Sequence, residues 1–158
     1  MSDKTSKFAG GLVIQSLAQT ETLAGRIAAN LRAGDAVALE GDLGAGKTTL
    51  ARGILRALGV TGIVPSPSFT LVQEYDTPGL RVTHCDFYRV ERAVELDELG
   101  LDDALADGAV LIEWPERAAA RIPPDALTVR IEIAGENGRR MEISGPQRWA
   151  HLLASGNS

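Results

Sequence analysis

The stretch from residue 41 to residue 49 reads GDLGAGKTT, and no other part of this chain constrains the fold as strongly. It matches the spacing Gly-x-x-x-x-Gly-Lys-Ser/Thr of a loop that binds phosphate groups. Residues 35–40 are typical of a short buried strand, and apolar residues recur every three or four positions in residues 50–58, as they do in a helix. Such a loop needs a strand before it and a helix after it, so the pattern predicts an α/β protein with a nucleotide site here.

The residue types within the loop fit this chemistry. Gly41, Gly44 and Gly46 lack a Cβ, so the backbone can take a positive φ and approach an anion closely. The N–H groups of the loop then converge on a phosphate at the N-terminal end of the helix dipole. Lys47 would reach the β- and γ-phosphates, and the hydroxyl of Thr48 would bind Mg²⁺. A glycine turn before an ordinary helix is the alternative, and the agreement of spacing, strand and helix disfavours it.

The composition is that of an ordinary globular protein, since 44% of the 158 residues are hydrophobic and 23% are charged. We therefore expect one domain over residues 1–158, with residues 154–158 as a loose tail. There is no apolar run long enough to cross a membrane, no secretory signal, and no second cysteine that could pair with Cys85. These features predict a cytoplasmic protein. The net charge of −5 argues against a broad basic face that grips nucleic acid directly.

Two carboxylates end predicted strands. Asp86 ends the strand predicted at residues 80–86, and Glu113 ends the apolar run of residues 109–113. A buried strand that delivers an acid at its carboxyl end is typical of a Mg²⁺ site in nucleotide-hydrolysing proteins, so we expect a metal-site role for Glu113. Asp86 is a candidate catalytic carboxylate, with a helix cap or a surface salt bridge as the alternative. Trp114 either stacks near the site or fills the core.

Hydroxyl residues follow the loop helix in the stretch SPSFT at residues 66–70. Ser66, Ser68 or Thr70 could sense the γ-phosphate or the metal, or they could cap a turn, and the residues leave both interpretations open. A strand running to residue 75, a turn at residues 76–79 and the strand at residues 80–86 predict an antiparallel hairpin.

The remaining elements follow from periodicity and turn residues. A helix is predicted at residues 20–31, capped by Thr20 or Thr22, and its first turn either touches an adenine or simply packs. His84 is expected to be a packed, hydrogen-bonded residue rather than a ligand, and Cys85 a small core residue. The other expected elements are a strand at 12–17, two short helices within 94–106 divided by Gly100, a hairpin of strands 127–133 and 139–144, and a short helix at 147–154.

Five motifs occur in a fixed order along the chain. They are GDLGAGKTT at 41–49, SPSFTLV at 66–72, HCDFYR at 84–89, Glu-Leu at 95–96 with Gly100, and LIEWP at 111–115. Together they resemble the bacterial TsaE (YjeE-type) P-loop ATPases of tRNA threonylcarbamoyladenosine synthesis, from about residue 11 to about residue 144. Each motif alone is modest, whereas all five in this order are highly specific. Ser68 stands where threonine is commoner, and Cys85 where a large apolar residue is common; neither departure puts the function in doubt.

The resemblance implies an accessory ATPase that supports threonylcarbamoyl modification of tRNAs reading ANN codons, without itself transferring the group. ATP would be the substrate, ADP the product and Mg²⁺ the cofactor. The implied partners are the proteins TsaD and TsaB, with tRNA reached only through their complex, and turnover would be slow without them. Two alternatives share the loop. One is a small-molecule or nucleotide kinase, for which the arginines are too scattered to form a lid, and the other is a module that senses ATP without hydrolysing it.

The resemblance also implies site residues and a fold. Asp86 would position or activate water, Lys47 would act on the phosphates, and Thr48 and Glu113 would hold Mg²⁺. The expected nucleotide-binding residues are Asp42, Leu43, Gly44, Ala45, Gly46, Lys47, Thr48, Thr49, Ser66, Thr70 and Trp114. The expected fold is a P-loop NTPase-like three-layer sandwich, with a mixed, mostly parallel sheet and added antiparallel hairpins.

Overall fold

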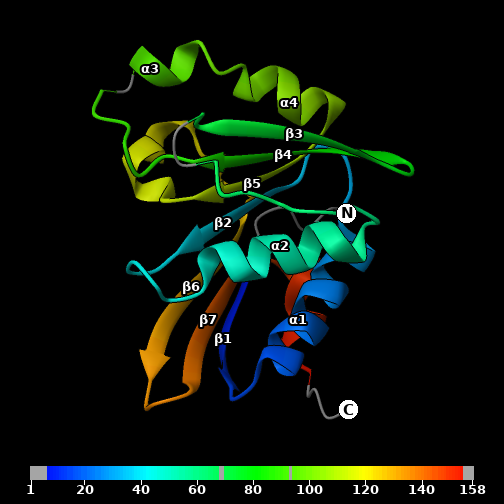
Figure 1. The fold of residues 1–158 in the computed structure, drawn as a ribbon, viewed down its shortest axis with the longest axis vertical. Helices are drawn as coiled ribbons and strands as arrows, with labels where there is room; N and C mark the ends of the chain where they lie inside the picture. The colour runs from blue at the N-terminus through cyan, green and yellow to red at the C-terminus, as the bar shows by residue number, and fades with distance from the viewer. Residues whose placement is uncertain (1–6, 68–69, 93, 155–158) are drawn as a thin grey trace.

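The computed structural model describes residues 7–67, 70–92 and 94–154, and its centre is a seven-stranded mixed sheet (Figure 1). The elements in chain order are β1 (Lys7–Ile14), α1 (Leu17–Asn30), β2 (Ala36–Glu40), α2 (Lys47–Ala57), β3 (Val72–Thr77), β4 (Leu80–Asp86), α3 (Val94–Asp97), α4 (Leu101–Asp107), β5 (Gly108–Glu113), the 3₁₀ helix η1 (Pro115–Arg121), β6 (Leu127–Ala134), β7 (Gly138–Pro146) and the 3₁₀ helix η2 (Gln147–Leu153). No helix in these ranges combines the length and apolar character that a bilayer crossing requires.

The strands lie in the order β1-β7-β6-β2-β5-β4-β3. The four central strands, β6, β2, β5 and β4, pair in parallel. Antiparallel pairs extend the sheet at both edges, through the β3–β4 hairpin on one side and through β6, β7 and β1 on the other. Only β3 and β7 of these strands therefore run against the others. The predicted α/β sandwich, with a mostly parallel sheet and added hairpins, is confirmed.

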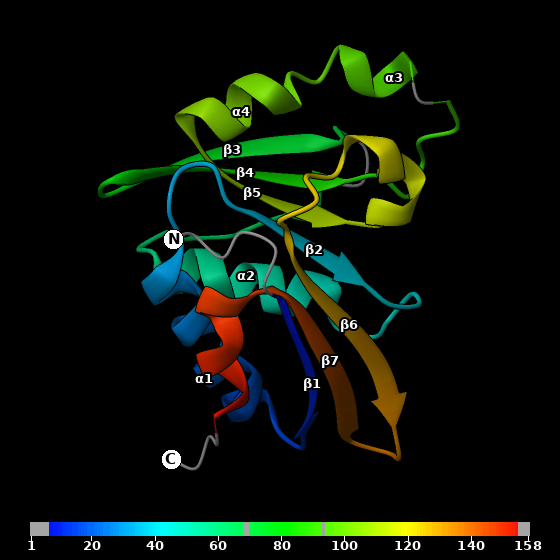
Figure 2. The same ribbon diagram turned by 180° about the vertical axis from the view of Figure 1, so that it is seen from behind.

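Helices cover both faces of the sheet, as Figures 1 and 2 show from opposite sides. The side chains of β5 alternate between these faces, as strand geometry requires. Ala109 and Leu111 pack in the cluster that contains α1 and α2, whereas Val110 and Ile112 pack in the cluster that contains Leu96 of α3 and Leu101 of α4. All the residues of β5 are buried, which explains the nearly continuous apolar run in its sequence. Glu113 ends this strand on the face of α2.

The N-terminal elements differ from the prediction. The first strand covers residues 7–14 rather than 12–17, and α1 begins at Leu17 rather than at residue 20. Ser16 caps this helix, because its backbone is extended and its side chain accepts a hydrogen bond from the N–H of Gln19 at 3.2 Å. Thr20 and Thr22 are therefore not caps; they lie within the helix, where the hydroxyl of Thr22 donates to the carbonyl of Ala18 at 3.1 Å.

Most of the other elements lie where the sequence predicts them. The strand at residues 80–86 is β4, and Gly100, with a φ of +70°, separates α3 from α4. The last predicted helix is a 3₁₀ helix, η2, which buries Trp149 and Leu152 in the core. Of the predicted tail, residues 155–158 lie outside the described residues, so that expectation stays a prediction.

Candidate nucleotide-binding site

The loop between β2 and α2 spans residues 41–46, and its three glycines all have a positive φ. At Gly41, with a φ of +149°, a Cβ would lie 2.5 Å from the carbonyl oxygen of Ile131, so only glycine allows β6 to approach this closely. At Gly44 and Gly46 a Cβ would meet nothing within 4 Å. The glycines in the second half of the loop therefore face open space, where an anion could approach the backbone.

Lys47 is the first residue of α2 and is buried. Its ammonium donates to the carbonyl of Gly41 and, at 3.0 Å, to that of Asp42, and it lies 4.1 Å from the centre of the Trp114 ring. Burial lowers the pKa of Lys47 from its usual value, while the nearby carboxylates, with Glu113 first, oppose this shift. A cation held in this way, at the end of the glycine loop, fits a phosphate group that would replace its carbonyl partners.

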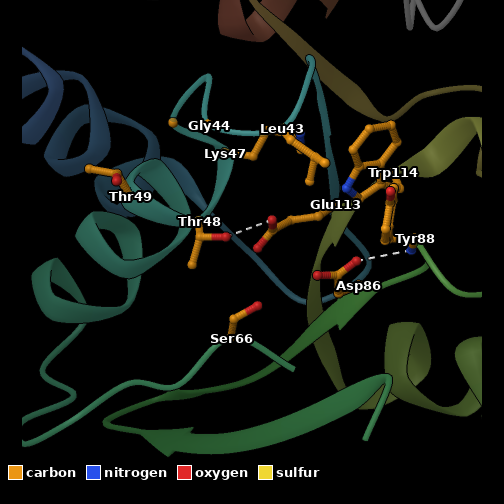
Figure 3. A pocket seen from close by; sticks show the side chains of 11 residues that line it. Leu43, Gly44, Lys47, Thr48, Thr49, Ser66, Asp86, Tyr88, Glu113 and Trp114 are labelled. Atoms are coloured by element: carbon orange, nitrogen blue, oxygen red, sulfur yellow. Dashed lines mark hydrogen bonds between the residues drawn. The ribbon is translucent and has the colours of Figure 1, made fainter. Parts of the chain in front are cut away.

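Glu113 lies opposite the loop helix, at the carboxyl end of β5, with only 2% of its surface exposed. The hydroxyl of Thr48 donates to its Oε1 at 2.7 Å, as the dashed line in Figure 3 shows. Its Oε2 lies 2.7 Å from Nε2 of His84, which is fully buried on the adjacent strand β4. Both carboxylate oxygens are therefore engaged, one by each neighbouring element.

Asp86 is buried at the end of β4, and the register of the parallel pair places it beside Glu113. Its Oδ1 accepts a hydrogen bond from the N–H of Tyr88 at 3.0 Å (Figure 3). Its own N–H donates to the carbonyl of Leu71 at 3.0 Å. Leu71 belongs to the SPSFTLV motif and has a positive φ of 66°, so this hydrogen bond links the backbone of that motif directly to Asp86.

These side chains surround one cavity of about 240 Å³ (Figure 3). The predicted site residues that line it are Leu43, Gly44, Gly46, Lys47, Thr48, Thr49, Ser66, Asp86, Glu113 and Trp114. Asp42 and Ala45 lie elsewhere, in the walls of cavities on other sides of the loop. Thr70 is exposed and is not among the described residues of this wall, and Ser68 lies outside the described residues.

The sequence interpretation did not single out Tyr88 on the wall of this cavity. Its ring lies 4.8 Å from that of Trp114, centre to centre, so the two form an aromatic rim. Trp114 has a positive φ of 60°, which costs a side-chain-bearing residue on the order of 1–3 kcal/mol. Tyr88 follows Asp86 by two residues within the motif HCDFYR. The sequence could have indicated Tyr88 if the whole motif had been treated as a candidate for the site.

A second cavity, of about 270 Å³, lies between the glycine loop, the start of α1 and the β6–β7 turn. Thr20 lines it, together with Ser16 and Leu17 of the α1 start and Asn137 of the β6–β7 turn. Residues 20–23 were expected either to touch an adenine or to pack; Thr20 lines this cavity, whereas Leu23 packs in the core.

Arg139 is a second residue that the sequence interpretation missed. Its Nε donates to the carbonyl of Ala45 at 2.7 Å and so joins the β6–β7 hairpin to the loop.

The donors at the first cavity fit a hard cation. The hydroxyl of Thr48 and the carboxylate of Glu113 are oxygen ligands, which Mg²⁺ prefers. Within the described ranges, no group of three or more histidine, cysteine, aspartate or glutamate side chains forms a metal cage by itself.

Comparisons with known proteins agree on one family. The matching family model is described as threonylcarbamoyl adenosine biosynthesis protein TsaE, and it matches residues 14–141. The tRNA threonylcarbamoyladenosine biosynthesis protein TsaE of Bacillus subtilis is 40% identical over 127 residues, which are 80% of this chain and 79% of that protein. Its Streptomyces coelicolor namesake is 39% identical over 133 residues, with coverages of 79% and 90%. The crystal structure of Bacillus subtilis YdiB is 31% identical, covers 94% of both chains and has a TM-score of 0.77.

Proposed function

Since this chain belongs to the TsaE family, which takes part in tRNA threonylcarbamoyladenosine biosynthesis, we propose that it binds ATP and hydrolyses it in support of that modification. One observation carries the proposal. The glycine loop, the Thr48–Glu113 pair and Asp86 all face the same cavity, although they come from distant parts of the chain. Phosphoryl transfer needs these three kinds of group together: a phosphate cradle, a cation site and a carboxylate for water.

The loop and Lys47 would hold the phosphates of ATP. Lys47 donates to two carbonyls of its own loop, and a phosphate is the stronger acceptor because it is ionised. Binding would therefore redirect the ammonium from these carbonyls toward the phosphates. Thr48 and Glu113 would hold Mg²⁺, which when bound neutralises phosphate charge.

Asp86 would position or activate the attacking water. Its carboxylate is buried, and the N–H of Tyr88 holds one oxygen in place. A carboxylate fixed in this way can accept a hydrogen bond from water without losing its orientation. The aromatic rim of Tyr88 and Trp114 would limit the access of bulk water.

The second cavity is the best candidate for the base and ribose of the nucleotide. It shares Gly46 and Thr49 with the wall of the first cavity, so one ligand could occupy both. Ser16 and Asn137 would offer polar contacts there, and Leu17 an apolar one.

The proposed partners are TsaD and TsaB, which would bring the tRNA. The net charge of −5 supports contact with a protein complex rather than with the nucleic acid itself. No arginine is among the described residues that line the first cavity. Turnover by the chain alone would then be slow, since an arginine supplied by a partner can raise such rates by roughly 10³–10⁵.

The test is phosphate release from Mg-ATP by the purified chain, alone and with the TsaD–TsaB complex. We expect slow release that changes when the complex is added. ADP formation that instead depends on a small acceptor would favour a kinase. Tight binding of Mg-ATP with no phosphate release under either condition would favour an ATP sensor.

The Asp86→Asn variant tests the catalytic assignment within this proposal. The shape of the side chain stays and its charge goes, so ATP affinity should be kept while turnover falls by roughly 10²–10⁴-fold. Asp102→Asn, an exposed position on α4, is the matched control and should keep both. Wild-type phosphate release from Asp86→Asn would remove Asp86 from the mechanism.

A further inference from the structure

Glu113 is held from two sides. The Thr48 hydroxyl donates to Oε1, and Nε2 of His84 lies against Oε2, each at 2.7 Å. A carboxylate only accepts, so Nε2 must carry the proton and donate. Within the described part of the chain, Nδ1 of His84 is buried and has no hydrogen-bond partner. Glu113 is therefore the side-chain partner of this imidazole among the described residues.

A histidine that served packing alone would be a costly choice at this position. His84 is fully buried on the face of the sheet that carries Leu111 and α2. Burying a polar ring with one nitrogen unpartnered costs free energy that an apolar side chain would not cost. The hydrogen bond that the imidazole donates to Glu113 is the interaction that an apolar side chain could not make.

Glutamate needs this support more than aspartate would. It has one more rotatable bond, so a glutamate at a strand end can direct its carboxylate in more ways. His84 comes from the adjacent strand, and its ring is fixed by complete burial. With Oε2 held by that ring, Oε1 is the oxygen directed toward Thr48 and the cavity.

We propose that His84 is a positioning residue for the metal site, which orients the Glu113 carboxylate so that Oε1, beside Thr48, faces the cavity where a cation would bind. The inference rests on the proposed function, because it assumes that Mg²⁺ binds with the nucleotide. Partners of this kind behind a metal ligand typically change metal affinity by roughly 10–100-fold when they are removed.

The experiment measures ADP affinity by calorimetry, once with Mg²⁺ and once with a chelator. The ratio of the two affinities is the magnesium increment. In His84→Met, which keeps the bulk and loses the donor, we expect this increment to fall by roughly 10-fold or to vanish, while the affinity without Mg²⁺ is kept. His84→Gln should restore most of the increment, because its amide N–H can reach the position of Nε2.

Two further variants keep the test sharp. Cys85→Ala also removes buried atoms from β4, on the opposite face of the sheet, and should leave the increment unchanged. If His84→Met fails to fold, His84→Asn takes its place, since asparagine is polar and its amide N–H reaches only the position of Nδ1. We expect His84→Asn to lose the increment that His84→Gln keeps.

The outcomes separate the two claims. A folded His84→Met or His84→Asn with the wild-type increment would make His84 a core residue only and overturn the inference, while the nucleotide site would stand. Wild-type protein that binds no ADP, or binds it without regard to Mg²⁺, would overturn the proposed function and the inference with it.

Discussion

Lys47 places a buried positive charge at the candidate site. It is the first residue of a helix, is buried, and has its charge directed at carbonyls of the loop before it. Burial opposes that charge, and the carboxylates around the cavity favour it. Removing the ammonium should therefore destabilise the ATP-bound protein more than the free protein.

Lys47→Ala is expected to weaken ATP binding by roughly 10- to 150-fold, the range for losing a hydrogen bond to a charged group. Lys7→Ala is the matched control, because that ammonium donates at 2.8 Å to the carbonyl of Pro124, outside the site. Fluorescence or calorimetric titration measures both. Equal affinities in the two variants would contradict the assignment of the phosphate loop.

Cys85 gives a second prediction at this scale. Burial, aided by the negative charge of Asp86, raises the pKa of the thiol to about 12. Only roughly one thiol in 10⁴ is then ionised at pH 8, so the native protein should react with iodoacetamide far more slowly than the urea-unfolded protein. Comparable rates in both states would show that Cys85 is accessible.

The same shift affects stability at high pH. The unfolded thiol ionises near its ordinary pKa of 9.0, and the folded thiol near 12. Between these values the folded state binds more protons than the unfolded state, so the free energy of unfolding falls as the pH rises. The contribution of this thiol is complete below pH 9 and is lost progressively above it.

Among the elements, α1 and α2 pack against each other beside the loop, and one glycine in each tests that contact. Gly53 of α2 faces Ala24 of α1 so closely that a Cβ would lie 2.8 Å from that of Ala24. A Cβ at Gly25, within α1, would meet nothing within 4 Å. The two glycines thus have different reasons to be there, although the sequence presents both as glycine within a helix.

Gly25→Ala is expected to raise the free energy of unfolding by roughly 0.5–1 kcal/mol, through helix propensity alone. Gly53→Ala gains the same propensity but overpacks the contact with Ala24, which costs about 1–3 kcal/mol, so its net effect should be destabilising. Urea denaturation measures both. A stabilised Gly53→Ala would mean that α1 and α2 move apart easily. The ADP affinity of that variant would then show whether the glycine loop before α2 moves as well.

At the scale of the whole molecule, the sheet brings the site together. Thr48 and Glu113 are 65 residues apart in the chain and meet at 2.7 Å. A nucleotide with Mg²⁺ would bind groups from α2, β4 and β5 at once. Ligand binding should therefore stabilise the fold as a whole.

We expect Mg-ADP at about 100 times its Kd to stabilise the protein by ~2.7 kcal/mol, which for a chain of this size raises Tm by roughly 5–10 °C. A chelator should reduce the shift measured at the same ADP concentration. Thermal unfolding monitored by circular dichroism measures both. An unchanged Tm at saturating Mg-ADP would contradict binding to the folded state.

What the sequence determined by itself is local. The spacing of the glycine loop, the strand before it and the helix after it are neighbours in the chain, so periodicity and residue type predict them. Asp86 and Glu113 were predicted as site residues for the same reason, since each ends a predicted strand. The cap of α1 was missed although it is also local, because three hydroxyl residues compete for that role and only the backbone geometry at Ser16 decides.

The tertiary structure decided which of these pieces meet. Periodicity reports that a strand is buried but not which strand lies next to it, so the pairing of β4 with β5 could not be read from the pattern. That pairing sets Asp86 beside Glu113 and directs His84 at the same carboxylate. Likewise, Arg139 reaches Ala45 only because β6 lies beside β2. Contacts between residues far apart in the chain depend on the order of the strands, and here that order brings the candidate site residues to one cavity.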